Sequence, residues 1–180
     1  MIQLINAYKD KDKIKNLYEF LNRFSDVHLS DDFNIKKGVH SIVISGSERF
    51  VSEGEFEDKW IKFIQEIEIP LLGICYGMQL ISYSFGANLI KGERIKGLRK
   101  VWIINREDIL KGLPETPYLP ESHYERVVSV SLNQDIIGIS DDGIEGIKIK
   151  ERKIFGTQFH FERSKKYGSI IIKNFLNIAK

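Results

Sequence analysis

PLLGICYGMQ, residues 70–79, is the stretch of sequence that decides the fold, and it holds the only cysteine among 180 residues. The apolar run Ile67–Ile74 predicts a buried strand. From Met78 to Phe85 apolar residues recur at the spacing of a helix. Cys75 is therefore predicted to lie on a sharp turn between a strand and a helix.

Two glycines flank this turn, Gly73 and Gly77, each two residues from Cys75. The spacing Gly-x-Cys-x-Gly is the cysteine counterpart of the Gly-x-Ser-x-Gly strand–turn–helix motif. At a helix N-terminus, the backbone N–H groups and the macrodipole favour a thiolate. A lone cysteine is more often a small packing residue. Here the flanking glycines and the strand–helix switch favour a nucleophile.

A base for this thiol is available near the other end of the chain, in IFGTQFHFE, residues 154–162. The first residues, Ile154–Phe159, predict a strand that leads to His160. Residues two apart in an extended segment share a face, so Glu162 is predicted beside His160. Together with Cys75 these residues match the nucleophile, base and orienting group of a catalytic triad.

These two motifs resemble those of the class I glutamine amidotransferases. Gly73–Gln79 looks like the nucleophile motif of that family, and Gly156–Glu162 looks like its base motif. The resemblance extends from a first strand near Ile2–Asn6 to a closing helix near residues 166–179. It implies a nucleophilic attack by Cys75 on the side-chain amide of L-glutamine, with release of ammonia.

The same resemblance implies roles for residues around the nucleophile. His160 would act first as acid and then as base, and Glu162 would orient it. The family places an oxyanion donor in a Gly-Gly-Pro turn, where this chain has Ser-Gly-Ser at residues 45–47. The backbone N–H groups of Gly46 and Tyr76 would be the two donors. Gln79, one helical turn after the cysteine, would contact the bound glutamine.

PESHYERV, residues 120–127, resembles the family's Ser-His-Gly-Asp-x-Val segment, whose backbone holds the amino-acid end of the substrate. By this resemblance His123, Tyr124 and Glu125 would be substrate-binding residues. Tyr124 replaces a glycine, and tyrosine adopts a positive φ less readily than glycine does. This side of the pocket is therefore expected to be reshaped. Phe161 replaces the family's usual proline between base and orienting group.

Composition agrees with one amidotransferase domain over residues 1–180, since 42% hydrophobic content supplies a core without room for a second enzyme. The formal net charge is only +2, which does not indicate a nucleic-acid partner. A basic cluster is predicted on solvated strand faces, with a docking patch as the alternative: Lys91, Arg94, Lys96, Arg99 and Lys100.

The sequence also limits compartment and cofactors. A single cysteine excludes an internal disulfide, and no signal peptide or long apolar span is recognisable, so a cytoplasmic location without membrane contact is predicted. Neither His28 nor His40 has a partner at a metal-ligand spacing, and no glycine-rich phosphate loop is found. No metal site and no cofactor are therefore expected.

The predicted fold is a three-layer α/β sandwich of the class I glutamine amidotransferase type, with a mainly parallel sheet and an antiparallel extension. The site should lie at the carboxyl ends of the strands. Leu110–Glu121, with three prolines, is predicted to be a mobile loop, and Asp142-Gly143 a hairpin turn. Strands are predicted near residues 2–6, 27–29, 41–45, 67–74, 101–104, 127–131, 136–140, 144–149 and 154–159, and helices near 11–24, 55–66, 78–85 and 167–178.

The fate of the ammonia is open at this stage. A domain without a synthetase should hand ammonia to another polypeptide, so a separate synthetase subunit is predicted as partner. Tyr76 and the pattern Ser122-His123-x-Glu125-x-Val127 look most like the glutaminase part of GMP synthetase. Two alternatives remain, a free-standing γ-glutamyl peptidase or hydrolase and a catalytically silent regulatory relative.

Overall fold

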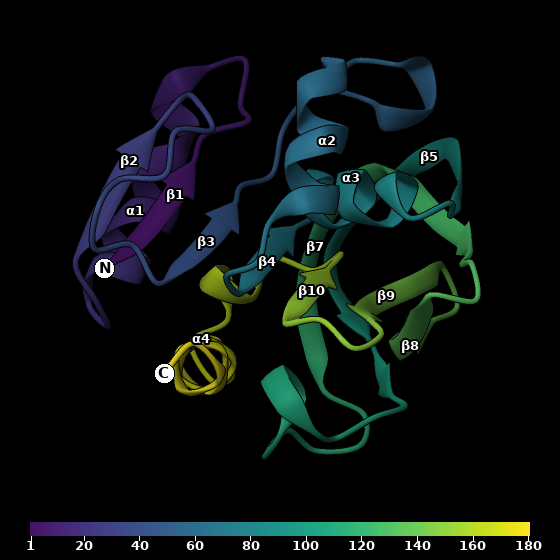
Figure 1. The fold of residues 1–180 in the computed structure, drawn as a ribbon. Coiled ribbons are helices and arrows are strands. Elements are labelled where there is room, and N and C mark those ends of the chain that lie inside the picture. The colour runs from purple at the N-terminus through teal and green to yellow at the C-terminus, as the bar shows by residue number, and fades with distance from the viewer.

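The computed structural model describes all 180 residues, which form one ten-stranded mixed sheet with helices on both faces (Figure 1). The strand order is β2-β1-β3-β4-β10-β9-β7-β5, with β8 pairing β9 and β6 pairing β8. The strands are β1 (Ile2–Ile5), β2 (Val27–Ser30), β3 (Ser41–Ile44), β4 (Leu71–Ile74), β5 (Asn88–Lys100), β6 (Trp102–Ile103), β7 (Tyr118–Ser129), β8 (Gln134–Ser140), β9 (Gly143–Ile149) and β10 (Ile154–Thr157). The helices are α1 (Lys15–Asn22), α2 (Asp58–Glu66), α3 (Tyr76–Ser84) and α4 (Gly168–Ile178), with short 3₁₀ helices η1 (Lys11–Ile14), η2 (Val51–Glu53), η3 (Asp108–Leu110) and η4 (Phe161–Arg163).

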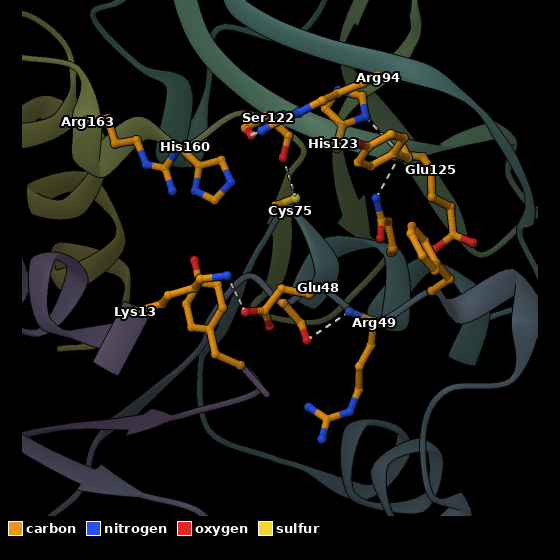
Figure 2. A pocket seen from close by; sticks show the side chains of 15 residues that line it. Lys13, Glu48, Arg49, Cys75, Arg94, Ser122, His123, Glu125, His160 and Arg163 are labelled. Atoms are coloured by element: carbon orange, nitrogen blue, oxygen red, sulfur yellow. Dashed lines mark hydrogen bonds and ion pairs between the residues drawn. The ribbon is translucent and has the colours of Figure 1, made fainter. Parts of the chain in front are cut away.

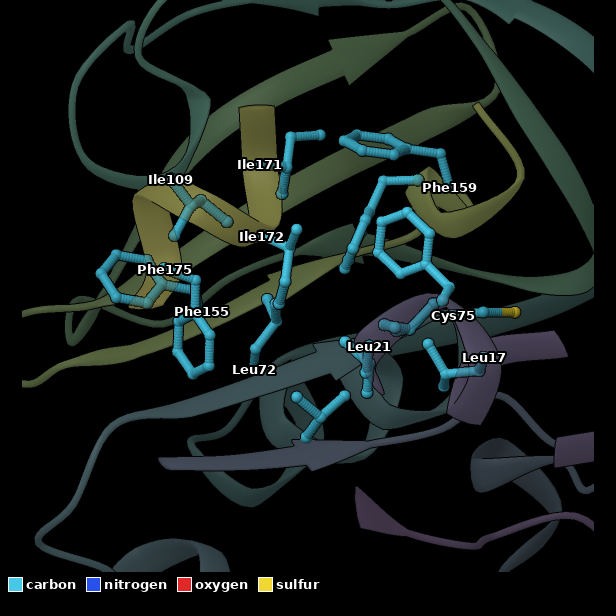
Figure 3. Close-up of a cluster of buried hydrophobic side chains, with 14 of the residues drawn as sticks. Leu17, Leu21, Leu72, Cys75, Ile109, Phe155, Phe159, Ile171, Ile172 and Phe175 are labelled. Atoms are coloured by element: carbon cyan, nitrogen blue, oxygen red, sulfur yellow. The ribbon is translucent and has the colours of Figure 1, made fainter. Parts of the chain in front are cut away.

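The parallel half of the sheet is buried on both faces because its strands are apolar throughout. In β3, Val43 points into one hydrophobic cluster and its neighbours Ile42 and Ile44 into the other. The first cluster includes residues of α1 and α4, and the second includes residues of α2 and α3. Figure 3 shows the first cluster, where Leu21 of α1 and Phe175 of α4 lie over the sheet. This alternation produces three layers.

The predicted fold class is confirmed. Strands β2, β1, β3, β4 and β10 run parallel, while β9, β7, β5, β8 and β6 form the antiparallel extension. The parallel strands carry the two segments that matter for chemistry, because β4 leads into Cys75 and β10 leads toward His160. They are direct neighbours, with Gly73 opposite Gly156. Motifs from opposite halves of the chain therefore meet at one edge of the sheet.

The predicted strand over Ile67–Ile74 is wrong in its first half. Strand β4 begins only at Leu71, and Ile67 ends helix α2. The backbone N–H of Ile67 donates to the carbonyl of Phe63 at 3.0 Å, which is a helical hydrogen bond. Apolarity predicted burial here, but a buried helix end and a buried strand have the same composition.

The proline-rich segment Leu110–Glu121 is not a loop throughout, because β7 begins at Tyr118. Pro120 lies inside that strand, opposite Leu98 of β5. A proline lacks the N–H that a strand donates, but its carbonyl still accepts a hydrogen bond from the backbone of His160 at 2.8 Å. The segment is therefore tied to the residue that precedes η4.

Strand β5 extends over 13 residues, whereas the sequence predicts only residues 101–104 of this region as a strand. It forms the edge of the sheet and carries the basic cluster on its exposed positions. Lysine and arginine on an edge strand discourage pairing with another chain. None of the helices is both long and apolar enough to cross a membrane.

Candidate active site

Cys75 lies in a strained turn between β4 and α3. Its φ is 53° and ψ is −105°, in a region that residues other than glycine rarely occupy. The turn needs both flanking glycines, because a Cβ on Gly73 would lie 2.4 Å from the backbone of Gly77. A Cβ on Gly77 would lie 2.6 Å from the carbonyl oxygen of Ile44. The backbone N–H of Cys75 donates to Thr157 at 2.7 Å, which fixes the turn to β10.

His160 and Glu162 meet behind this thiol. The Nδ1 atom of His160 lies 2.7 Å from Oε1 of Glu162, and both side chains are 4% exposed. They do not share a face of an extended strand, as the sequence predicted. Strand β10 ends at Thr157, and the chain then turns into η4, which folds Glu162 back toward the imidazole.

The charge state of His160 follows from its two neighbours. Burial by itself would lower the pKa of His160, but the Glu162 carboxylate and the adjacent Cys75 raise that pKa to about 10. The imidazole is therefore protonated at neutral pH. Its Nδ1 is engaged by Glu162, which leaves Nε2 free to face the thiol. Figure 2 shows His160 and Cys75 on the same side of the pocket.

A cavity of about 330 Å³ opens over these residues (Figure 2). Most of the side chains around it are polar or charged, and six of the predicted site residues line it: Cys75, Gln79, His123, Tyr124, Glu125 and His160. Gly46, Tyr76 and Glu162 were also predicted as site residues but do not line this cavity. Glu162 lies behind the imidazole, and the Tyr76 hydroxyl donates in another direction, to the Glu55 carbonyl at 2.9 Å.

The two predicted oxyanion donors are both backbone N–H groups without a partner in the chain. Gly46 donates no hydrogen bond, and Tyr76, as the first residue of α3, has no intrahelical acceptor. A Cβ on Gly46 would lie 3.1 Å from Cε1 of His160, so this backbone passes close to the base. The Ser-Gly-Ser turn is fixed by Ala7, which donates to Ser45 Oγ at 2.9 Å and accepts from Ser47 Oγ at 2.7 Å.

Gln79 is buried and is connected to the nucleophile through a second glutamine. Its Nε2 donates to the carbonyl oxygen of Glu125 at 2.8 Å and to Oε1 of Gln158 at 3.1 Å. The Nε2 of Gln158 then lies 3.4 Å from Sγ of Cys75. The sequence placed Gln158 in the base motif but did not identify it as a contact of the thiol.

The third wall of the cavity comes from β7. Tyr124 is extended and does not adopt a positive φ, and its ring packs edge-on against Phe50 with centroids 6.1 Å apart. Tyrosine therefore replaces glycine without backbone strain, and it widens the wall instead. The Glu125 carboxylate does not face the cavity as a free group. It accepts the backbone N–H groups of Val51 and Ser52 at 2.8 and 2.6 Å and so orders η2.

Sequence reasoning missed several residues at the site. Tyr8 lines the cavity, and burial raises the pKa of its hydroxyl. Arg94 also lines it, with its guanidinium 3.5 Å from the Ser122 hydroxyl and in no ion pair. It belongs to the basic cluster that was expected on a solvated face. Only the pairing of β5 with β7 shows that one member of the cluster faces the pocket.

Three buried titratable groups lie behind the β7 wall, and Glu121 and Glu145 among them were not predicted. Polar atoms of Glu121, His123 and Glu145 lie within 4.8 Å of one another, which is close enough to hold a cation. Glu121 and His123 alternate along β7, and this i, i+2 spacing is the only sequence signal for the cluster. The rest depends on the pairing of β7 with β9.

Comparisons with known proteins agree with this geometry. The family model for glutamine amidotransferase class I matches residues 11–179. The glutamine-hydrolyzing subunit of GMP synthase from Pyrococcus furiosus is 35% identical over 141 residues, which cover 77% of this chain and 74% of that protein. The glutamine-hydrolyzing GMP synthase of Thermotoga maritima is 33% identical over 87% of this chain, which spans 31% of that longer protein.

Solved structures show the same fold. A crystal structure of a proposed GMP synthase subunit from Thermoplasma acidophilum matches with a TM-score of 0.87 and 27% identity, over 99% of this chain and 92% of that one. The structure of PurLQS from Thermotoga maritima matches with a TM-score of 0.77 at 17% identity, over 99% of both chains, and it bears on the fold alone. By its family match, its relatives and its fold, this chain is a member of the class I glutamine amidotransferases.

Proposed function

We propose that Cys75, His160 and Glu162 form a catalytic triad that hydrolyses the side-chain amide of glutamine. The observation that carries this proposal is the contact of 2.7 Å between His160 and Glu162, on the same cavity wall as the only thiol of the chain. A protonated imidazole beside a thiol at a helix N-terminus stabilises the thiolate that attacks a carbonyl.

The geometry suggests how each group would act. Sγ of Cys75 attacks the amide carbon, and the N–H groups of Gly46 and Tyr76 stabilise the oxyanion. Nε2 of His160 gives its proton to the departing amide nitrogen, which leaves as ammonia. A water molecule then loses a proton to the same nitrogen and attacks the γ-glutamyl thioester, which releases glutamate and restores the thiol. Glu162 holds the imidazole throughout.

Arg94 is proposed to bind the substrate's α-carboxylate. It is a cation at the cavity wall with no anionic partner in the chain, whereas Lys13 is paired with Glu48 at 2.6 Å. The guanidinium also lies over the Tyr124 ring, at 5.8 Å from the centroid, which holds it at the rim. A planar guanidinium suits a carboxylate because it can donate two parallel hydrogen bonds.

The ammonia is proposed to pass to a separate synthetase subunit of the GMP synthetase type, which would place the chain in purine biosynthesis. The support is the match to the Pyrococcus furiosus protein, which is named as one subunit of GMP synthase and is of similar length. A cytoplasmic enzyme that acts on small metabolites agrees with this proposal. Residues 1–180 would then be a single amidotransferase domain.

The first experiment traps Cys75 with a glutamine-analogue electrophile, read by intact mass, with Cys75→Ala as the blank. Because the chain has one cysteine, one adduct assigns the site. We expect a single adduct that excess glutamine suppresses. Suppression by a γ-glutamyl dipeptide but not by glutamine would point instead to a free-standing γ-glutamyl peptidase. Labelling by a small alkylating agent alone would point to a silent relative.

The partner is tested separately, by mixing the chain with the synthetase subunit of GMP synthetase from the same organism. GMP formation with glutamine as the only nitrogen source is expected, and Cys75→Ala should abolish it. Ammonium salts should restore GMP formation in that mixture, because the synthetase itself is intact. GMP formation that is equally fast without this chain would refute the partnership.

A further inference from the structure

A buried cluster behind the pocket contains two carboxyl groups and one imidazole. Glu121 and His123 point to the same side of β7, and Glu145 lies on the neighbouring strand β9. The three residues are 3%, 5% and 1% exposed. The proposed hydrolysis does not use the two glutamates, although His123 lines the cavity.

The hydrogen bonds of His123 fix where its protons are. Its Nδ1 lies 2.9 Å from the carbonyl oxygen of Glu125, which can only accept, so Nδ1 carries a hydrogen. Its Nε2 lies 2.8 Å from Oε2 of Glu121. That second contact also needs a proton, either on the carboxyl group of Glu121 or on Nε2.

Each carboxyl group keeps one oxygen without a partner. Ser140 donates to Oε1 of Glu145 at 2.6 Å, but Oε2 of Glu145 and Oε1 of Glu121 are buried and unpaired. Leaving two such oxygens unsatisfied is costly, and two adjacent buried carboxylates cannot both be ionised. A proton between the two groups would satisfy both oxygens.

The surrounding charges do not neutralise the cluster in another way. Arg99 on β5 faces it but is already paired with Asp142 of the β8–β9 turn, at 3.5 Å. His160, which follows β10, is paired with Glu162. No unpaired cation therefore balances a doubly ionised pair of glutamates. Burial raises the pKa of both carboxyl groups, as expected for a pair that retains a proton.

We propose that Glu121 and Glu145 share one retained proton and that this pair holds His123 against the Glu125 carbonyl, so that both glutamates are positioning residues for the glutamine pocket. The second part of this inference rests on the proposed function. The same carbonyl accepts from Gln79, which is linked through Gln158 to Cys75. Loss of the proton would thus loosen the wall on which the substrate is bound.

The shared proton is tested without any activity assay. In protein with ¹³C-labelled glutamate carboxyl groups, we expect one protonated carboxyl signal at pH 6 that titrates only above neutral pH. Glu145→Gln should abolish this signal, because the amide donates in place of the proton, and Glu93→Gln on the exposed edge of β5 should retain it. Two ionised carboxylates at pH 6, or one bound metal ion per chain by elemental analysis, would overturn the proposal.

The positioning role is tested by comparing Glu145→Leu with Glu145→Gln. The leucine variant should raise KM for glutamine at least about tenfold, the size of a lost charge-assisted hydrogen bond, with kcat changed far less. The conservative glutamine variant should restore most of the affinity and should lose the rise of KM that the wild type shows above pH 8.

Two outcomes would refute the positioning role. One is a Glu145→Gln variant whose KM follows pH as the wild type does. The other is a pair of variants that melt at lower temperature with unchanged KM, which would indicate structure alone. If Glu145→Leu does not fold, the pH profile of the glutamine variant decides. If the wild type hydrolyses no glutamine, the proposed function fails, and the carboxyl titration still decides whether the proton is shared.

Discussion

The Nδ1 atom of His160 lies 2.7 Å from the Glu162 carboxylate although only one residue separates them, because the chain bends into η4 between them. In an extended strand the two side chains would run parallel and splay apart. The bend points one at the other. It also places the backbone N–H of His160 on the Pro120 carbonyl, so the base is held from both sides.

This contact predicts the effect of Glu162→Gln. The amide cannot supply the charge that raises the pKa of His160 to about 10, so that pKa should fall. We expect kcat for glutamine hydrolysis to drop by about 10²–10⁴, as for loss of an orienting carboxylate. The exposed substitution Lys165→Gln is the control. A Glu162→Gln enzyme with wild-type kcat would show that the carboxylate has no orienting role.

The strained turn predicts that Gly77 is irreplaceable. In Gly77→Ala the new Cβ would meet the Ile44 carbonyl at 2.6 Å, and backbone cannot yield as a flexible side chain can. We expect a loss of about 1–3 kcal/mol in the free energy of unfolding, together with loss of thiol reactivity. Gly138→Ala is the matched control, because its Cβ would lie at an ordinary 3.5 Å from Val101. Equal urea midpoints for the two variants would contradict the steric argument.

The free guanidinium at the rim predicts a binding defect. Arg94→Ala should raise KM for glutamine about tenfold, the scale of one charge-assisted hydrogen bond, and leave kcat nearly constant. Lys96→Ala lies on the same exposed strand but outside the cavity and serves as control. A kcat effect without a KM effect would assign Arg94 to another step.

The buried glutamates predict how stability depends on pH. Burial raises the pKa of Glu121 to about 7 and that of Glu145 to about 8, from ordinary values of 4.5. The folded state then binds more protons than the unfolded state between these values, so the free energy of unfolding should fall as pH rises from about 4.5 to 8. Urea titrations of the wild type should show this slope, and Glu145→Gln should flatten it. A wild-type curve that rises over this range would rule out retained protons.

The sequence by itself determined the nucleophile, its base and the fold class. Glycine at two fixed distances from Cys75 permits only a tight strand–helix turn, and apolar runs long enough for strands but lacking alternation require a sheet covered on both faces. The residues for chemistry could be named because they are local: each motif spans fewer than ten residues, and no distant contact is needed to recognise it.

Only the tertiary structure decided which other residues join the site. Arg94 belongs by sequence to a solvated basic edge until β5 pairs with β7, and Glu121 and Glu145 meet only because β7 lies beside β9. The bend that joins His160 to Glu162 also escaped prediction, since period-two spacing describes a strand and not a 3₁₀ turn. Strand pairing and turns depend on contacts between residues far apart in sequence, and local periodicity carries no information about such contacts.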